Sequence, residues 1–126
     1  MKNRNILKID LDLEFYEESK ELIRTRLTYL NSLNILSITN IKKIELIKKN
    51  KYSCKITLVK DLLNPYYIII FQAILGDDWR RIAITFRDLK LGMSNYNRLF
   101  NIKTYSNGEV IEGDVIDITK DILEAF

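Results

Sequence analysis

The fold follows from one stretch near the N-terminus, Ile6-Leu7-Lys8-Ile9-Asp10-Leu11-Asp12-Leu13-Glu14-Phe15. From Leu7 onward, apolar residues occupy every second position, and charged residues stand between them. Because the side chains of a strand point alternately to its two faces, this period of two predicts a β-strand with one buried face. From Tyr16 the apolar spacing becomes that of a helix, and two acids stand in the first predicted turn, so a helix is expected directly after the strand.

The middle of the chain continues the pattern of alternating elements. Segments 41–47 and 52–59 flank a lysine-rich turn and form a predicted hairpin. Segment 66–91 fits either two helices or a hairpin of two strands, because its isoleucines favour strands. The Asn-Pro dipeptide before it, the break at Gly76 and the helical spacing that starts at Trp79 favour two helices.

The C-terminal part is predicted to contain strands at 98–105 and 110–118 and a short helix or tail at 119–126. The resulting order is β-α-β-β-α-α-β-β in one domain, 1–126. This order predicts an α+β fold with an antiparallel sheet and helices on one face. The core has the ferredoxin-like pattern that RRM modules and polymerase palms share, with an additional C-terminal strand.

The composition excludes several kinds of site. The chain of 126 residues has no His and one Cys. A His-based catalytic triad, a His metal ligand and a Cys-cluster zinc site are therefore excluded, and Cys54 is expected to be a reduced core residue. The longest apolar run is far shorter than a membrane span, and no signal peptide is visible, so we expect a cytoplasmic protein without a membrane partner.

Charge is unevenly distributed along the chain. Residues 36–60 carry seven lysines against Glu45, whereas residues 106–126 carry six acids against Lys120. Ordinary solvated faces explain such a pattern, and lysines also protect sheet edges from aggregation. The alternative is a basic surface for a polyanion such as nucleic acid.

Two sets of residues are candidates for a functional site. Asp10 and Asp12, with Glu14, would share one face of the first strand, where two carboxylates could hold Mg²⁺ for phosphoryl transfer; a solvated strand face is the alternative. The second set is a predicted nucleic-acid surface on the hairpin and the later helix: Lys48, Lys49, Lys51, Lys55, Arg80, Arg81 and Arg87.

Several segments together resemble a family of small uncharacterised proteins from phages, archaeal viruses and mobile elements. They are Asp10-Leu11-Asp12, the run 72–81 that contains Leu75-Gly76-Asp77-Asp78-Trp79-Arg80-Arg81, Arg87, and the run 97–103. The family has an acidic strand, a basic hairpin and a Leu-Gly-Asp-Asp-x-x-Arg helix motif, and it is similar to a minimal primase–polymerase palm. The family's hairpin carries a His, but this chain has Lys51-Tyr52-Ser53-Cys54-Lys55 there, and Thr85 stands near the place of a later acid. The resemblance therefore implies a catalytically inactive relative.

Three functions are carried forward, in this order. The first is a nucleic-acid-binding protein of a virus, plasmid or other mobile element that acts in replication or its control. The second is a protein-binding module, such as a viral inhibitor of a host defence complex. The third is a Mg²⁺-dependent nucleotidyl transferase or nuclease that uses Asp10 and Asp12. The sequence does not show whether the ligand is DNA or RNA, nor what the oligomeric state is.

Overall fold

The computed structural model describes residues 5–48, 50–60, 64–93, 103–106 and 109–126, with side chains omitted for residues 103–112. The elements of the first part are β1 (Ile6–Asp10), α1 (Tyr16–Ser32), η1 (Ile38–Asn40), β2 (Ile41–Lys48) and β3 (Tyr52–Leu58). Those of the second part are α2 (Tyr67–Leu75), α3 (Trp79–Lys90), β4 (Lys103–Ser106), β5 (Glu109–Glu112), β6 (Asp114–Asp117) and α4 (Thr119–Leu123).

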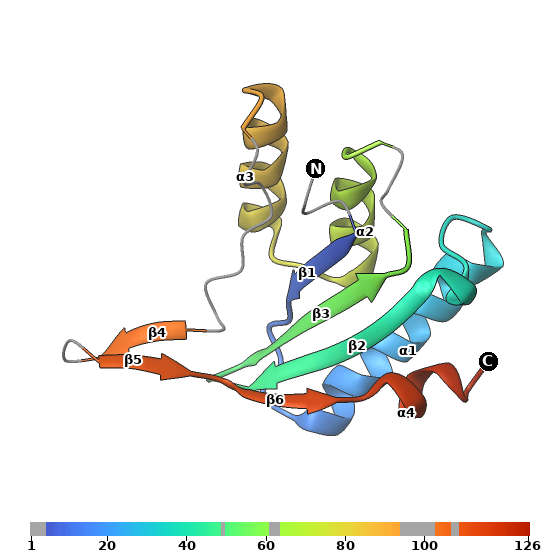
Figure 1. The fold of residues 1–126 in the computed structure, drawn as a ribbon, viewed down its shortest axis with the longest axis horizontal. Helices are drawn as coiled ribbons and strands as arrows, with labels where there is room; N and C mark the ends of the chain where they lie inside the picture. The colour runs from blue at the N-terminus through green and yellow to red at the C-terminus, as the bar shows by residue number, and fades with distance from the viewer. Residues whose placement is uncertain (1–4, 49, 61–63, 94–102, 107–108) are drawn as a thin grey trace.

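The predicted α+β class is confirmed. Four strands form an antiparallel sheet in the order β1-β3-β2-β6 (Figure 1). The predicted hairpin is formed by β2 and β3, and β1 lies on the far side of β3. Strands β4 and β5 pair with each other in a separate two-stranded sheet.

Helices α1, α2 and α4 cover one face of the sheet and enclose the core. Leu7 and Ile9 of β1 are almost fully buried there, as the alternation in the first strand predicts. They pack in one cluster with the buried residues of the helices, such as Leu27, Phe71 and Ile122. Burial of these large apolar side chains, at roughly 1.5–3 kcal/mol each, holds the helices to the sheet.

The ambiguous segment 66–91 is two helices. Asn64 accepts a hydrogen bond from the Tyr66 amide (2.9 Å) and so shapes the turn before α2. Gly76 ends α2 with φ +89°, in the left-handed region that glycine adopts readily. Asp78 is the N-cap of α3, and its carboxylate accepts from the Arg80 amide (2.9 Å).

Three predicted boundaries differ from the structure. Strand β1 ends at Asp10 rather than at Phe15. The segment 110–118 is divided between β5 and β6, which belong to different sheets, because Gly113 separates them. The predicted strand 98–105 is described only from Lys103, as β4, and it pairs with β5 rather than with the main sheet. The order β1-β3-β2 is that of the predicted ferredoxin-like core, and β6 beside β2 is the additional C-terminal strand of the described sheet.

Helix α3 stands apart from the other helices. Figure 1 shows it beyond the outer edge of β1, with α2 as its nearest helix. Its two residues classed as buried are polar, Thr85 and Asp88. Among the described residues, no helix is long and apolar enough to cross a membrane.

Candidate functional site

Asp12 and Glu14, which the sequence places with Asp10 on one face of the first strand, lie beyond the end of β1 at Asp10. The Leu11 amide donates to the Tyr52 carbonyl (3.0 Å), but the Tyr52 amide donates to the carbonyl of Leu13 (3.1 Å). Leu11 and Leu13 therefore both pair with Tyr52, and the backbone bulges at Asp12 between them. Leu11 is buried and Leu13 half-buried, whereas Asp12 and Glu14 are exposed, so the carboxylates still alternate with apolar side chains.

Asp10 and Asp12 are engaged by different partners. The Asp10 carboxylate accepts from the buried Ser53 hydroxyl (3.4 Å). Asp12 has an 84% exposed side chain and pairs with Lys51 (2.5 Å). Within the described residues, no group of three or more His, Cys, Asp or Glu residues could hold a metal ion. The Mg²⁺ hypothesis, which requires Asp10 and Asp12 to share one cation, stays a prediction.

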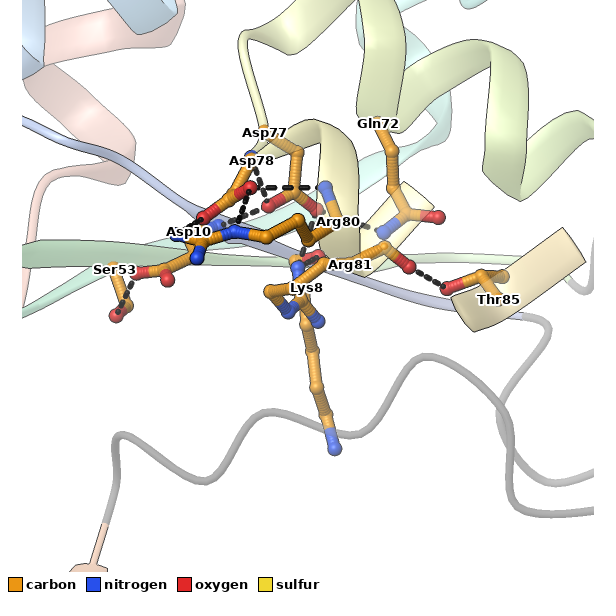
Figure 2. Close-up of polar contacts among 9 residues, drawn as sticks. All are labelled: Lys8, Asp10, Ser53, Gln72, Asp77, Asp78, Arg80, Arg81 and Thr85. Atoms are coloured by element: carbon orange, nitrogen blue, oxygen red, sulfur yellow. Dashed lines mark hydrogen bonds and ion pairs between the residues drawn. The ribbon is translucent and has the colours of Figure 1, made fainter. Parts of the chain in front are cut away.

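A buried polar cluster closes the outer edge of β1 (Figure 2). Among the described strands β1 lies at the edge of the sheet, so its backbone groups on one side have no partner in another described strand. Asp77 accepts from the Asp10 amide (2.9 Å), and Arg81 donates to the Lys8 carbonyl (3.1 Å). These two side chains supply the acceptor and the donor that another strand would otherwise provide.

Asp77 is the centre of this cluster. Its side chain is fully buried and forms an ion pair with Arg81, one helical turn further along. It also accepts from the Gln72 side-chain amide (2.8 Å) and from the Asp78 amide (2.8 Å). A buried carboxylate is stable only when such donors replace its water, and here the donors come from β1, from α2, from the α2–α3 turn and from α3.

The Leu-Gly-Asp-Asp-x-x-Arg motif consequently has a structural role. Gly76 reverses the chain, Asp77 and Arg81 hold the edge of β1, and Asp78 caps α3. Of the predicted nucleic-acid residues, Arg81 is therefore committed to the fold: its side chain is 16% exposed. Thr85 lies on the same inner face, where it donates to the Arg81 carbonyl (3.0 Å) and is buried.

The solvent face of α3 consists of two adjacent rows of residues at helical spacing. We call these rows and their eight side chains the outer face of α3. All eight residues are exposed, whereas the other residues from position 81 to position 89 are buried or half-buried. The first row is Trp79, Ala83, Phe86 and Lys90, and the second is Arg80, Ile84, Arg87 and Leu91.

The outer face of α3 combines cations with apolar side chains. Arg80 and Arg87 have side chains that are 72% and 63% exposed. Each is held at its base by a carboxylate, Asp78 and Asp88 respectively, which leaves further guanidinium N–H groups directed to solvent. The hydrogen bond to Asp78 and the charge of this carboxylate raise the pKa of Arg80, and the hydrogen bonds that Arg80 donates lower the pKa of Asp78.

The lysines of the hairpin fall into two groups. Lys48 and Lys51 lie beside its turn: Lys48 stacks over the Tyr52 ring (4.6 Å), and Lys51 pairs with Asp12. The hydrogen bond to Asp12 and the charges of Asp12, Glu14 and Asp10 raise the pKa of Lys51. Lys49 lies outside the described residues.

Lys55 lies on the face of the main sheet that is opposite the core, which we call the second face. It is the cross-strand partner of Lys8, and both side chains are half-buried. Burial, together with the charges of Lys55 and Arg81, lowers the pKa of Lys8. Cys54, on the opposite side of the strand, is fully buried, and burial raises the pKa of its thiol. Among the described residues of the main sheet, the second face presents no aromatic ring of the kind that RRM modules use to stack bases.

Sequence reasoning missed two features of this region. Trp79 was predicted only as part of a helical stripe, but it is the most exposed large apolar residue of the described chain, at 73%. Gln72 was not predicted at all, although it is buried and bonded to Asp77. A polar Gln inside the otherwise apolar run 67–75 is the signal that could have found it.

No protein-family model, curated protein or solved structure matches this chain.

Proposed function

We propose that this protein binds nucleic acid through the outer face of α3. The observation that carries the proposal is the arrangement of exposed Arg80, Arg87 and Lys90 beside exposed Trp79 on one helix. Arginine and lysine neutralise phosphates, and aromatic rings stack on bases, so this combination suits nucleic acid.

The distribution of acids supports the proposal. Asp88 is the one acid within α3, and its side chain is 6% exposed beneath Arg87. Asp77 is buried and Asp78 is 28% exposed, so the acids of the α2–α3 turn and of α3 are less exposed than the guanidinium groups of Arg80 and Arg87. A polyanion that approaches the outer face of α3 meets cations first.

Lys51 extends the basic surface toward the hairpin. It pairs with the exposed Asp12, and Lys48 lies at the other side of the hairpin turn. The resemblance to small proteins of mobile elements agrees with this reading and suggests a replication or control factor. The proposed origin in a mobile element rests on this resemblance alone.

The test is the salt dependence of binding to a labelled 20-nucleotide oligomer, measured by fluorescence anisotropy. Three phosphate contacts predict that log K falls against log salt with a slope of roughly −2 to −3. Replacing Arg80 and Arg87 together by serine is expected to reduce the slope by about two. The matched control is Arg26→Ser, which removes an exposed arginine from α1. Absence of binding at about 50 mM salt would overturn the proposal.

A protein-binding role is the second candidate, and α2 favours it. Residues 67–75 contain no charged side chain, yet Tyr67 and Ile70 are about two-fifths exposed, as is Tyr66 just before them. Exposed apolar surface of this kind is typical of an interface between proteins. Sedimentation velocity of the protein and of Ile70→Lys tests the simplest case, a second copy of the chain: a dimer that Ile70→Lys dissociates would support it, and a monomer at all concentrations would refute it.

A further inference from the structure

We infer that the outer face of α3 binds single-stranded rather than duplex nucleic acid, by stacking an unpaired base on Trp79. The inference rests on the proposed function and names its ligand class. It depends on the state of the Trp79 ring, on the rigidity of its position and on the row of cations beside it.

The Trp79 ring is free for stacking. It is 73% exposed, and no ring contact or cation–π contact involves it among the described residues. Phe86, two turns further along the same row, differs in this respect. Its ring meets the edge of Tyr66 (6.1 Å) and is covered by the Lys90 ammonium (5.4 Å). Of these two rings, Trp79 is therefore the one that presents an open surface to a base.

The backbone under Trp79 is held firmly. Trp79 is the first residue of α3, directly after the Asp78 cap. One residue earlier, the Asp77 side chain is fixed to β1 and to Arg81. A ring that is mobile only at its own side-chain torsions loses little conformational entropy when a base stacks on it.

The neighbouring cations define the path of the phosphates. Arg80 and Arg87 lie two helical turns apart, about 10 Å along the axis, in the row next to Trp79. A single strand can place its backbone along this row and turn a base onto the indole. In a duplex the bases are paired and stacked on each other, so the indole would find only groove edges and sugars.

The experiment compares one labelled oligothymidine of 12 nucleotides with a blunt duplex of the same length. Binding is followed by anisotropy and by tryptophan fluorescence, since the chain has a single Trp and its emission reports on position 79 alone. We expect quenching and tighter binding with the single strand. Trp79→Ala should weaken binding of the single strand by about 5- to 150-fold, the range of a lost stacked base, while Trp79→Phe retains most of the affinity.

Two controls make the outcome decisive. Tyr29→Ala removes a ring that is 52% exposed on α1 and should leave binding unchanged. A circular-dichroism melt of Trp79→Ala shows whether the variant is folded, as its exposure predicts. Equal affinity for both forms, or an unchanged affinity of folded Trp79→Ala for the single strand, would overturn this inference and leave the proposed function intact. Failure of both oligomers to bind would overturn the proposed function itself.

Discussion

Arg80 and Arg81 are neighbours in the chain and have opposite surroundings. Arg81 reaches inward, where it pairs with buried Asp77 and holds the Lys8 carbonyl at the edge of β1. Arg80 is exposed on the outer face of α3 and pairs with Asp78 at the surface. One step along a helix turns a side chain by about 100°, which is enough to separate a structural residue from a candidate binding residue.

The comparison extends to the whole of α3. Its inner face carries Arg81, Thr85 and Asp88, whereas its outer face carries Trp79 and Phe86. Leu89 on the inner side packs against the core, but the buried positions of α3 are polar, and the outer face mixes large apolar side chains with cations. On the inner side Arg81 holds the edge of β1, whereas the exposed Trp79 ring makes no ring contact in the described chain. This contrast is why we place the candidate site outside.

The largest effect is expected from breaking the inner pair. Asp77→Ala leaves the Arg81 guanidinium half-buried without its carboxylate and the Asp10 amide without an acceptor. The free energy of unfolding in urea should fall by about 3 kcal/mol. Asp12→Ala, at an exposed carboxylate nearby, is the control and should change little. A loss below about 1 kcal/mol for Asp77→Ala would show that the edge of β1 does not need this cluster.

A smaller effect is expected at the cap between the two faces. Asp78→Ala removes the acceptor of the Arg80 amide at the start of α3 and should cost about 1 kcal/mol in the free energy of unfolding. Asp78→Ser restores a capping oxygen without the charge and should recover most of this loss. If both variants lose the same amount, the charge of Asp78 rather than its cap stabilises the helix.

A weaker, pH-dependent effect is expected at Lys8, beside the inner arginine. The pKa of Lys8 is lowered in the folded protein from the ordinary lysine value of 10.5, which applies to the unfolded chain. The folded protein therefore releases this proton at a lower pH than the unfolded chain. The unfolded state binds more protons in that interval, and stability from this group therefore rises with pH between the two pKa values. Lys8→Met should be more stable than the wild type at pH 7, and the difference should shrink as pH approaches 10.5. Lys42→Met, at an exposed lysine of β2, should show no such trend.

The smallest effect on stability is expected at the outer arginine. Arg80→Met breaks an ion pair at the surface, and the free energy of unfolding should stay within the error of the wild-type value. The matched change Arg81→Met should destabilise the protein clearly. Equal losses for the two variants would contradict the division of α3 into an inner and an outer face.

The sequence predicted the elements well where one pattern dominated. The alternation through Ile9, the helix from Tyr16 to Ser32 and the hairpin of β2 and β3 were all confirmed. The predicted end of the first strand was wrong, because a bulge after Asp10 interrupts the pairing with β3 although the alternation continues in the sequence. The candidate site was predicted only in part. Arg80 and Arg87 are exposed as expected, but Arg81 is structural. The importance of Trp79 depends on the exposure of its side chain, which cannot be read from one sequence.

The amino-acid sequence by itself determined the α+β class, the buried face of β1 and the two helices separated at Gly76, since periodicity and turn chemistry act over a few residues. Only the tertiary structure decided which strand lies at the edge and which charged residues close it. Asp77 and Asp10 are 67 positions apart, and their hydrogen bond exists because the fold brings the α2–α3 turn to β1. Local patterns carry no information about such distant pairs, so the inner and outer faces of α3 could be distinguished only in three dimensions.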